Sequence, residues 1–178
     1  MKKFTVIFFV ACSLLITTKT NAQNKTGYIS VDEMVLLMPE TAKIDSLLKK
    51  FRTDSIQPQL NYIVSEYRRK DSIYKDTLKT PLSIRKTVEP ELQNLLYQIE
   101  NWNTIEQQAL QSKQDEYLQP IYKKVVDAIK DVAKEKGYSY VYSREALLVA
   151  PPGDDLLPLV AAKLKVTVPA TRTAGTGN

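Results

Sequence analysis

Two narrow stripes of apolar residues, each repeating at three- and four-residue steps, constrain the fold of this chain more than any other feature. They lie over residues 41–76 and 88–132. Such spacing predicts helices with one buried face and charged flanks. A helix over the first range would extend roughly 50 Å, which is long for a globular protein. Joined by a turn at Thr80-Pro81, the two stripes predict an antiparallel helical hairpin with coiled-coil-like packing.

Prolines interrupt both stripes. Pro58 lies inside the first stripe and Pro120 inside the second. Proline has no backbone N–H to donate, and its ring clashes with the preceding turn, so a helix that contains it kinks or divides. We therefore expect Pro58 and Pro120 to be the hinges of the hairpin.

Short β-prone segments lie on both sides of the helical region. Residues 28–31 precede it, and residues 138–142 and 147–150 follow it, with Arg144-Glu145 placed for a β-hairpin connection. Three short strands are too few to satisfy the edges of a sheet, so we expect the strands of three copies to share one body. The alternative is a monomeric sheet covered by a terminal helix. The residues assigned to contacts between copies are Tyr28, Ile29, Val31, Tyr140, Val141, Leu147 and Val149.

The second stripe and the β-prone residues after it both end on clear signals. Lys134 and Lys136 followed by Gly137 predict a helix C-terminus, because cations favour the negative end of the helix dipole and glycine accepts the left-handed cap. After the stop at residues 151–153, Asp154-Asp155 predicts the N-terminus of a short helix over residues 156–164. The Thr- and Ala-rich tail, 165–178, is predicted to be disordered.

The composition argues against most enzyme classes. The chain has no His, one Cys and five Gly. Without His it lacks the usual catalytic base and the usual metal ligand, and its scattered glycines form no phosphate-binding loop. The adjacent acids Asp115-Glu116 and Asp154-Asp155 fit a solvated helix face and a helix cap. We therefore expect a protein that is not an enzyme, with no catalytic residue, metal or cofactor.

The N-terminal segment has the layout of a secretory signal peptide. Met1-Lys2-Lys3 is basic, residues 4–16 are apolar, and a polar stretch ends at Ala22, which predicts cleavage after Ala22. A membrane anchor would need about 20 apolar residues, and a lipoprotein would use Cys12. Removal of residues 1–22 takes away three cations and no acid, so the net charge falls from +5 to +2. We expect an exported, soluble protein, and export argues against nucleic acid as a partner.

Charge is segregated along the hairpin. Residues 67–86 carry a net charge of +5 and residues 89–116 a net charge of −5. Cations gathered near a projecting turn produce a field that could steer an acidic partner. The alternative is two ordinary solvated faces that attract each other within the hairpin. The candidate contact residues are Arg68, Arg69, Lys70, Lys75, Lys79, Arg85 and Lys86, together with Tyr67 and Tyr74.

Four tyrosines lie along the predicted hairpin: Tyr62, Tyr67, Tyr74 and Tyr97. Their amphipathic rings could contact an unfolded chain through many weak contacts. The alternative is that they pack in the seam between the helices, as aromatic residues at helical spacing usually do.

Four triplets of the form Asp, then Ser or Thr, then an aliphatic residue resemble the O-glycosylation signal of some exported bacterial proteins. Such triplets also arise easily in amphipathic helices, so modification is one of two readings. The triplets are Asp45-Ser46-Leu47, Asp54-Ser55-Ile56, Asp71-Ser72-Ile73 and Asp76-Thr77-Leu78.

The order of these segments resembles the Skp/OmpH family of periplasmic chaperones. The resemblance covers about residues 27–165 and is most specific in residues 27–40 and 129–164. It rests on Gly27-Tyr28-Ile29-Ser30-Val31, Met38-Pro39-Glu40, the run from Ile129 to Tyr138, and the closing run from Leu147 to Asp155. It implies an α+β, mostly α fold: a signal peptide at 1–22, a β body from 23–40 and 133–164, a helical hairpin at 41–132, and the tail.

The resemblance also implies a function. Members of this family form trimers whose three hairpins enclose a cavity, and there they hold unfolded outer-membrane proteins in the periplasm without ATP. In the family, basic hairpins are associated with clients and with lipid headgroups. Here only the distal part of the hairpin is basic, which departs from a uniformly basic cavity. The alternative function is a structural or adaptor protein of the envelope that docks a folded partner.

Overall fold

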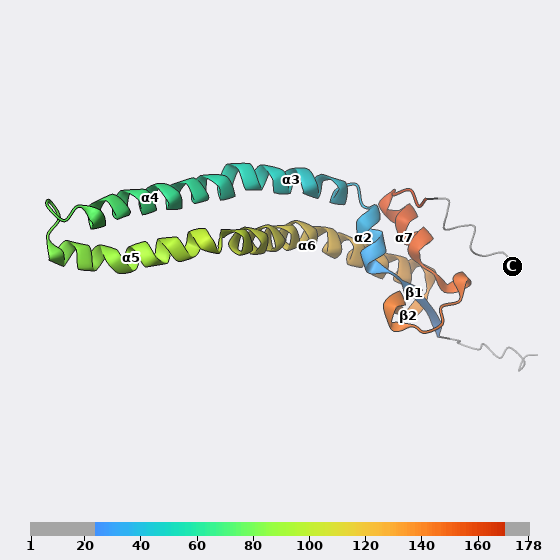
Figure 1. Cartoon of the computed structure of the whole chain (residues 1–178). Coiled ribbons are helices and arrows are strands. Elements are labelled where there is room, and N and C mark those ends of the chain that lie inside the picture. The colour runs from blue at the N-terminus through green and yellow to red at the C-terminus, as the bar shows by residue number, and fades with distance from the viewer. Residues whose placement is uncertain (1–23, 170–178) are drawn as a thin grey trace, which may run out of the picture.

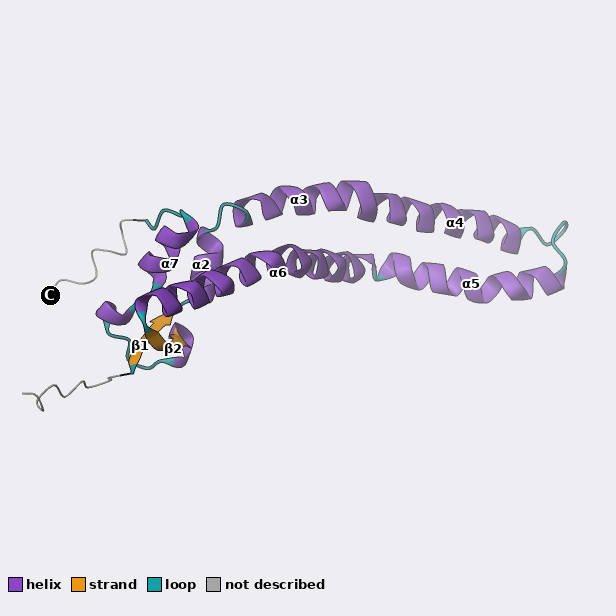
Figure 2. Ribbon diagram, turned by 180° about the vertical axis from the view of Figure 1, so that it is seen from behind, coloured by secondary structure: helices purple, strands orange, loops and turns teal. Residues whose placement is uncertain are grey.

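The computed structural model describes residues 24–169 and shows a long helical hairpin that projects from a small body (Figure 1). The two strands and the terminal helix lie at one end, and the two arms of the hairpin run side by side away from them; Figure 2 shows the same arrangement from behind. The predicted fold class, mostly α with a long helical hairpin and a small β body, is confirmed. The predicted signal peptide, 1–22, lies outside the described residues.

The sheet of the body joins the two ends of the hairpin. Strand β1 (Lys25–Ile29) pairs in parallel with β2 (Tyr138–Ser143), and Tyr28 lies opposite Tyr142. Parallel strands need a crossover connection, and here the whole hairpin serves as that connection. The strand β1 needs glycine at position 27, because a Cβ there would lie 2.2 Å from Leu156 Cδ1.

The predicted β-hairpin after β2 is wrong. Residues Arg144–Ala146 form a 3-10 helix, residues 147–150 form no strand, and a second 3-10 helix spans Pro152–Asp154. Part of the other edge of β1 is taken by a bridge between Tyr28 and Asp155. Glu145 accepts hydrogen bonds from Ser30 and Ser143, and the bond from Ser30 holds the first 3-10 turn against the residue that follows β1. The predicted third strand therefore pairs with neither strand of its own chain.

Two short helices complete the body. Helix α2 (Val31–Leu37) begins at Ser30, whose Oγ accepts a hydrogen bond from the Glu33 N–H at 3.4 Å. Helix α7 (Leu157–Leu164) has Leu156 and not the predicted Asp154-Asp155 as its N-cap, and Asp155, one residue earlier, accepts a hydrogen bond from the Leu157 N–H at 2.9 Å. Burying an apolar side chain completely stabilises a fold by about 1.5–3 kcal/mol. The fully buried core side chains of the body are Ile29, Met34, Met38, Val125, Leu156, Leu157 and Val160.

The outgoing arm changes helix type before Pro58. It consists of a 3-10 turn (Thr41–Lys43), α3 (Ile44–Phe51), a π-helical turn (Arg52–Ile56) and α4 (Gln57–Lys75). Pro58 lies in the first turn of α4, where its missing N–H is tolerated. The π turn lets the Gln57 N–H donate to the carbonyl of Arg52, five residues earlier. The helix type thus changes just before Pro58, and the hinge at Pro58 stays a prediction.

The returning arm divides where no break was predicted. It consists of α5 (Leu82–Glu100) and α6 (Trp102–Lys136), separated at Asn101. The Asn101 side chain donates to the carbonyl of Tyr97 at 2.8 Å and so competes with the helix backbone. Pro120, where a kink or division was predicted, lies inside α6, which runs through it without a break. Pro90 lies inside α5.

Two apolar clusters hold the arms. Near the body, Ile44 of α3 and Ile121, Val125 and Ile129 of α6 join the main core, so the packed body extends into the base of the hairpin. Midway along the arms, Ile56, Ile63 and Trp102 form a second, smaller cluster. These clusters account for the spacing of the sequence stripes.

The helix end at Gly137 follows its prediction, whereas the start of the tail does not. Gly137 takes a left-handed conformation with φ of 71°, and Lys134 and Lys136 lie in the last turn of α6. The tail was predicted to begin at residue 165. Instead, Val166 donates its N–H to the carbonyl of Ala161, and both Val166 and Val168 pack against the core. Residues 165–169 therefore belong to the body, and 170–178 lie outside the described residues.

Candidate functional site

The far end of the hairpin is a turn stabilised by one aspartate. Residues 76–81 join α4 to α5, and the Asp76 Oδ1 accepts a hydrogen bond from the Lys79 N–H at 3.0 Å. The Asp76 carbonyl accepts from the Thr80 N–H, also at 3.0 Å. Asp and Asn favour such turns because their side chains bind the backbone a few residues on. The turn is therefore a defined structure at the end of the arms (Figure 1).

Residues 67–86, here called the basic tip, carry seven cations that divide into two groups. Arg69 pairs with Glu66 at 2.7 Å, Lys75 with Asp71 at 2.8 Å, and Lys70 with Glu91 on the opposite arm. The Arg69 hydrogen bond lowers the pKa of Glu66, and the Asp71 hydrogen bond raises the pKa of Lys75. Within residues 24–169, no ion pair engages the other four cations of the basic tip, which are Arg68, Lys79, Arg85 and Lys86.

Neither sequence-based interpretation of the charges accounts for all of them. The pairs Lys70–Glu91 and Arg52–Glu106 cross between the arms, as attraction between two solvated faces requires. Such exposed pairs contribute at most about 1 kcal/mol each. Of the unpaired cations, Arg68, Lys79 and Lys86 are exposed, as a steering role requires, whereas Arg85 is half buried.

Exposed aliphatic side chains accompany these cations, and the sequence interpretation missed them. Leu78 is 96% exposed, and Leu82 and Ile84 are about half exposed. Their exposure could have been predicted from the sequence, because these residues lie in or next to the predicted turn and fit neither apolar stripe. The basic tip is thus both cationic and apolar.

The tyrosines of the hairpin differ in exposure. Tyr62 and Tyr97 are exposed on α4 and α5, whereas Tyr67 and Tyr74, the two chosen as contact residues, are half buried. The exposed pair leaves its rings open to a client, as the first interpretation requires, and client contact by any of the four tyrosines stays a prediction.

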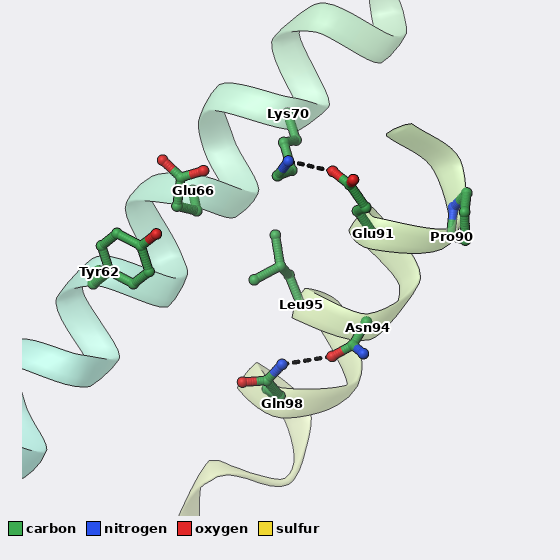
Figure 3. A pocket seen from close by; sticks show the side chains of 8 residues that line it. All are labelled: Tyr62, Glu66, Lys70, Pro90, Glu91, Asn94, Leu95 and Gln98. Carbon is green, nitrogen blue, oxygen red and sulfur yellow. Dashed lines mark hydrogen bonds and ion pairs between the residues drawn. The ribbon is translucent and has the colours of Figure 1, made fainter. Parts of the chain in front are cut away.

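A cleft of about 500 Å³ separates the arms below the basic tip. In Figure 3, Leu95 points between the arms, Lys70 and Glu91 close one side of the cleft, and Asn94 bonds to Gln98. The lining mixes charged, amide, aromatic and apolar groups, so it offers many contact types rather than one specific set. The remaining lining residues are Tyr62, Glu66 and Pro90.

The predicted hinges have different surroundings. Pro58 is exposed directly after the π turn. Pro120 lines a largely apolar cleft of about 380 Å³ between α3 and α6, with Leu47 and Tyr117. Beside this cleft, Lys124 binds Glu40 at 2.6 Å and lowers the pKa of that carboxyl.

The residues predicted to contact other copies separate into a buried and an exposed group. Tyr28 and Ile29 are 5% and 1% exposed, because they are buried within their own chain. Val31, Val141 and Leu147 are half buried. Tyr140 and Val149 are exposed.

Two further residues, not selected from the sequence, join the exposed group. Tyr142 stacks on Tyr140 with ring centroids 6.4 Å apart, and Leu148 is fully exposed. No strand within residues 24–169 pairs with the outer edge of β2. We use the name open edge for this edge and the exposed residues Tyr140 and Tyr142 of β2, together with the exposed Leu148 and Val149 that follow β2 in the chain.

Metal binding and membrane spanning have no support in the described part of the chain. Within residues 24–169, no group of three or more acidic side chains is placed to hold a metal ion. Over the same residues, no helix combines the length and the apolar character that crossing a bilayer requires.

Comparison with known proteins identifies the family. The model of the OmpH family, described as outer membrane protein (OmpH-like), matches residues 25–164. One similar solved structure is that of a protein from Caulobacter crescentus CB15 proposed as an outer membrane chaperone (OmpH-like). It has a TM-score of 0.50 and 17% sequence identity, covering 83% of this chain and 87% of that one. No curated protein matches the chain. Because the family model spans most of its length, the chain belongs to the OmpH-like family.

Proposed function

We propose that this protein is a non-catalytic, ATP-independent holdase of the periplasm, which binds unfolded outer-membrane proteins and prevents their aggregation. The observation that carries this proposal is the hairpin, whose end presents exposed Leu78 beside unpaired cations. An extended surface of mixed apolar and cationic groups suits many weak contacts with an unfolded chain better than one specific ligand. Membership of the OmpH-like family supports a chaperone role in general.

A trimer is part of the proposal. In the open edge, Leu148 and Val149 are exposed and the outer edge of β2 pairs with no strand of the described residues, and such an edge readily pairs with another chain. Three copies joined through this edge would bury it and place three hairpins around one cavity. We assign the contacts between copies to the open edge together with the half-buried Val31, Val141 and Leu147.

Client contact is assigned to the inner faces of the hairpins and to the basic tip. The cations Arg68, Lys79, Arg85 and Lys86 attract acidic segments, while the exposed tyrosines and the cleft between the arms offer apolar and hydrogen-bonding contacts. None of these contacts depends on a particular client sequence. The surface therefore fits a class of clients rather than one partner.

The primary experiment is light scattering of the mature protein, alone and after dilution of a urea-unfolded outer-membrane barrel protein into it. We expect a mass of three chains that rises by one client and stays in solution. A trimer that leaves the client to aggregate would refute the holdase and favour an adaptor that docks a folded partner. A monomer would refute the shared β body.

A matched pair of variants locates the client contact. The variant with Lys79→Gln and Lys86→Gln removes two unpaired cations from the basic tip, and the control with Lys49→Gln and Lys50→Gln removes two from α3. Both variants lose the same net charge. We expect client affinity to fall several-fold in the tip variant only, with less salt dependence than in the parent. Equal losses would assign the effect to net charge.

Lipid contact at the basic tip is tested with the same pair. Vesicles containing anionic lipid would bind the parent and the α3 control but not the tip variant if the cations recognise lipid headgroups. That result, combined with unchanged client affinity, would overturn the assignment of the basic tip to clients.

We also propose that the hairpin bends at Pro58 and Pro120, so that the cavity takes clients of different size. The π turn before Pro58 and the cleft beside Pro120 are places where the arm can bend with little loss of packing. We expect Pro58→Ala and Pro120→Ala to narrow the range of client sizes held in solution. An unchanged size range in both variants would refute the hinge role.

A further inference from the structure

The four Asp-Ser/Thr-aliphatic triplets are the part of the sequence that neither the fold nor the proposed function explains. Ten Asp residues lie between positions 24 and 169, and four of them begin such a triplet. All four triplets lie on the outgoing arm or the turn at its end. The structure places them in different surroundings, and this difference selects one of them.

Three of the triplets lie in helical backbone. Ser46 of α3 donates its hydroxyl to the carbonyl of Lys43 at 2.8 Å, so that hydroxyl is already engaged. The triplet at residues 54–56 lies in and around the π turn, and its aliphatic residue, Ile56, is only 4% exposed. Ser72 lies in α4, where the following Ile73 is half buried. Of these three triplets, only residues 45–47 are exposed throughout, and there the backbone is helical and the hydroxyl is engaged.

In the fourth triplet, Asp76-Thr77-Leu78, the hydroxyl-bearing residue and the aliphatic residue are both exposed, and Asp76 is half buried. It lies in the turn between α4 and α5, outside helical backbone. Thr77 is exposed, and the aliphatic Leu78 is 96% exposed. The hydrogen bonds from Lys79 and Thr80 to Asp76 fix the turn, and the Thr77 hydroxyl has no hydrogen-bond partner within residues 24–169.

The charges around this turn suit a phosphate-linked sugar donor. Lys79 follows the triplet directly, and Arg85 and Lys86 lie in the first turns of α5, all without an ion pair in the described part of the chain. A donor whose sugar is attached through phosphate carries negative charge, so the basic tip attracts it. The hydroxyl, the aliphatic residue and one unpaired cation therefore lie in three successive residues, and two more cations follow at the start of α5.

We propose that Thr77 is an O-glycosylation site, modified after export of the folded chain. In the reaction, Thr77 Oγ1 attacks the anomeric carbon of a sugar linked through phosphate, and the bond from that carbon to the phosphate oxygen breaks. The phosphate leaves with the bonding electrons, and the hydroxyl proton passes to a base of the transferase. No oxidation or reduction takes place.

The attached glycan has a consequence for the basic tip. A bulky hydrophilic group on Thr77 would lie beside Leu78 and hinder the approach of a second hairpin end, while the cleft between the arms stays open to an unfolded chain. This would keep the ends of the hairpins from associating with one another. The inference rests on the export that the proposed function includes, but not on the holdase activity.

The test is the intact mass of the full-length protein recovered from the envelope of its own bacterial host. We expect a mass above that of residues 23–178 by whole sugar units, lost in Thr77→Ala and retained in Thr77→Ser. Ser46→Ala, Ser55→Ala and Ser72→Ala are the matched controls and should keep the increment.

The outcomes separate this inference from the proposed function. A mass equal to that of residues 23–178 would refute glycosylation while confirming export and cleavage after Ala22. An increment that survives Thr77→Ala would refute the assignment to Thr77, and one lost only in Ser46→Ala, Ser55→Ala or Ser72→Ala would move the site to a helix. Light scattering with the unfolded client then tests the holdase on the same samples.

Discussion

In the body, Met34 and Leu156 have no exposed surface, whereas at the basic tip Leu78 is 96% exposed and Ile84 is 48% exposed. Both regions contain aliphatic side chains, but only the body has a second layer of helix to cover them. The tip consists of two helix ends and a turn, and its aliphatic residues Leu78, Leu82 and Ile84 stay exposed. The body is therefore built for stability, and the basic tip for contact with another molecule. Four measurements test this contrast.

The largest expected effect is in the body. Met34→Ala removes a fully buried side chain from the main core and should lower the free energy of unfolding by about 2–5 kcal/mol. Leu36→Ala, on the same helix at a position that is 73% exposed, is the matched control and should change it by less than about 0.5 kcal/mol. Urea denaturation measures both. A large loss from Leu36→Ala would mean that another copy covers this residue.

The second effect is expected in the arms. Trp102 is 7% exposed in the smaller cluster with Ile56 and Ile63. Trp102→Ala should cost about 3 kcal/mol, near the lower end for aromatic truncation because two helices can close partly over the gap. Hydrogen exchange should show faster opening of the amides around residues 52–64 and 95–110, with the body unchanged. Equally faster hydrogen exchange along the whole chain would show that the body and the arms do not open independently.

The third effect depends on pH and lies at the start of α2. Hydrogen bonds from Ser143 and Ser30 lower the pKa of Glu145 from 4.5 to about 2. Because the folded state holds this carboxyl ionised, its contribution to stability is present above pH 4.5 and is lost as the pH falls towards 2. Glu145→Gln should therefore be less stable than the parent at neutral pH and equal to it at the acid end. Urea midpoints across this range measure the difference, and a pH-independent difference would exclude the ionised carboxylate as its cause.

The smallest effect is expected near the tip, where Lys70 and Glu91 join the arms across the cleft (Figure 3). Both side chains are partly exposed, so a double-mutant cycle with Lys70→Ala and Glu91→Ala should give a coupling below about 1 kcal/mol. The coupling should fall further in high salt. A coupling of several kcal/mol would make the tip a region built for stability and would weaken the contrast with the body.

Local sequence signals predicted the elements whose causes are local. The spacing of the apolar stripes predicted the two arms. The end of α6 was predicted from Lys134, Lys136 and Gly137, because a helix cap depends on a few neighbouring residues. Asn101 also breaks the helix through a local contact, to the carbonyl of Tyr97. Asn occurs inside many helices without this effect, so its identity alone could not have predicted the break.

Strand pairing and side-chain exposure could not be predicted from local sequence signals. The alternating Tyr138–Tyr142 predicted a strand, but its partner proved to be the distant β1 and not residues 147–150. The seven cations of the basic tip were visible in the sequence, yet their division into paired and unpaired groups depends on which residues of α5 face α4. The same holds for the four triplets, whose sequences are equivalent and whose accessibility is not.

By itself, the sequence determined the long helical hairpin, its position between two small β-prone ends, and the charge at its turn. These follow from periodicity, capping and composition, which act over a few residues. The tertiary structure alone decided that β1 and β2 pair in parallel, that Tyr28 and Ile29 are buried in their own chain, and that Thr77 and Leu78 project into solvent. Those outcomes depend on contacts between residues more than 100 positions apart, or on the absence of such contacts at the end of the hairpin.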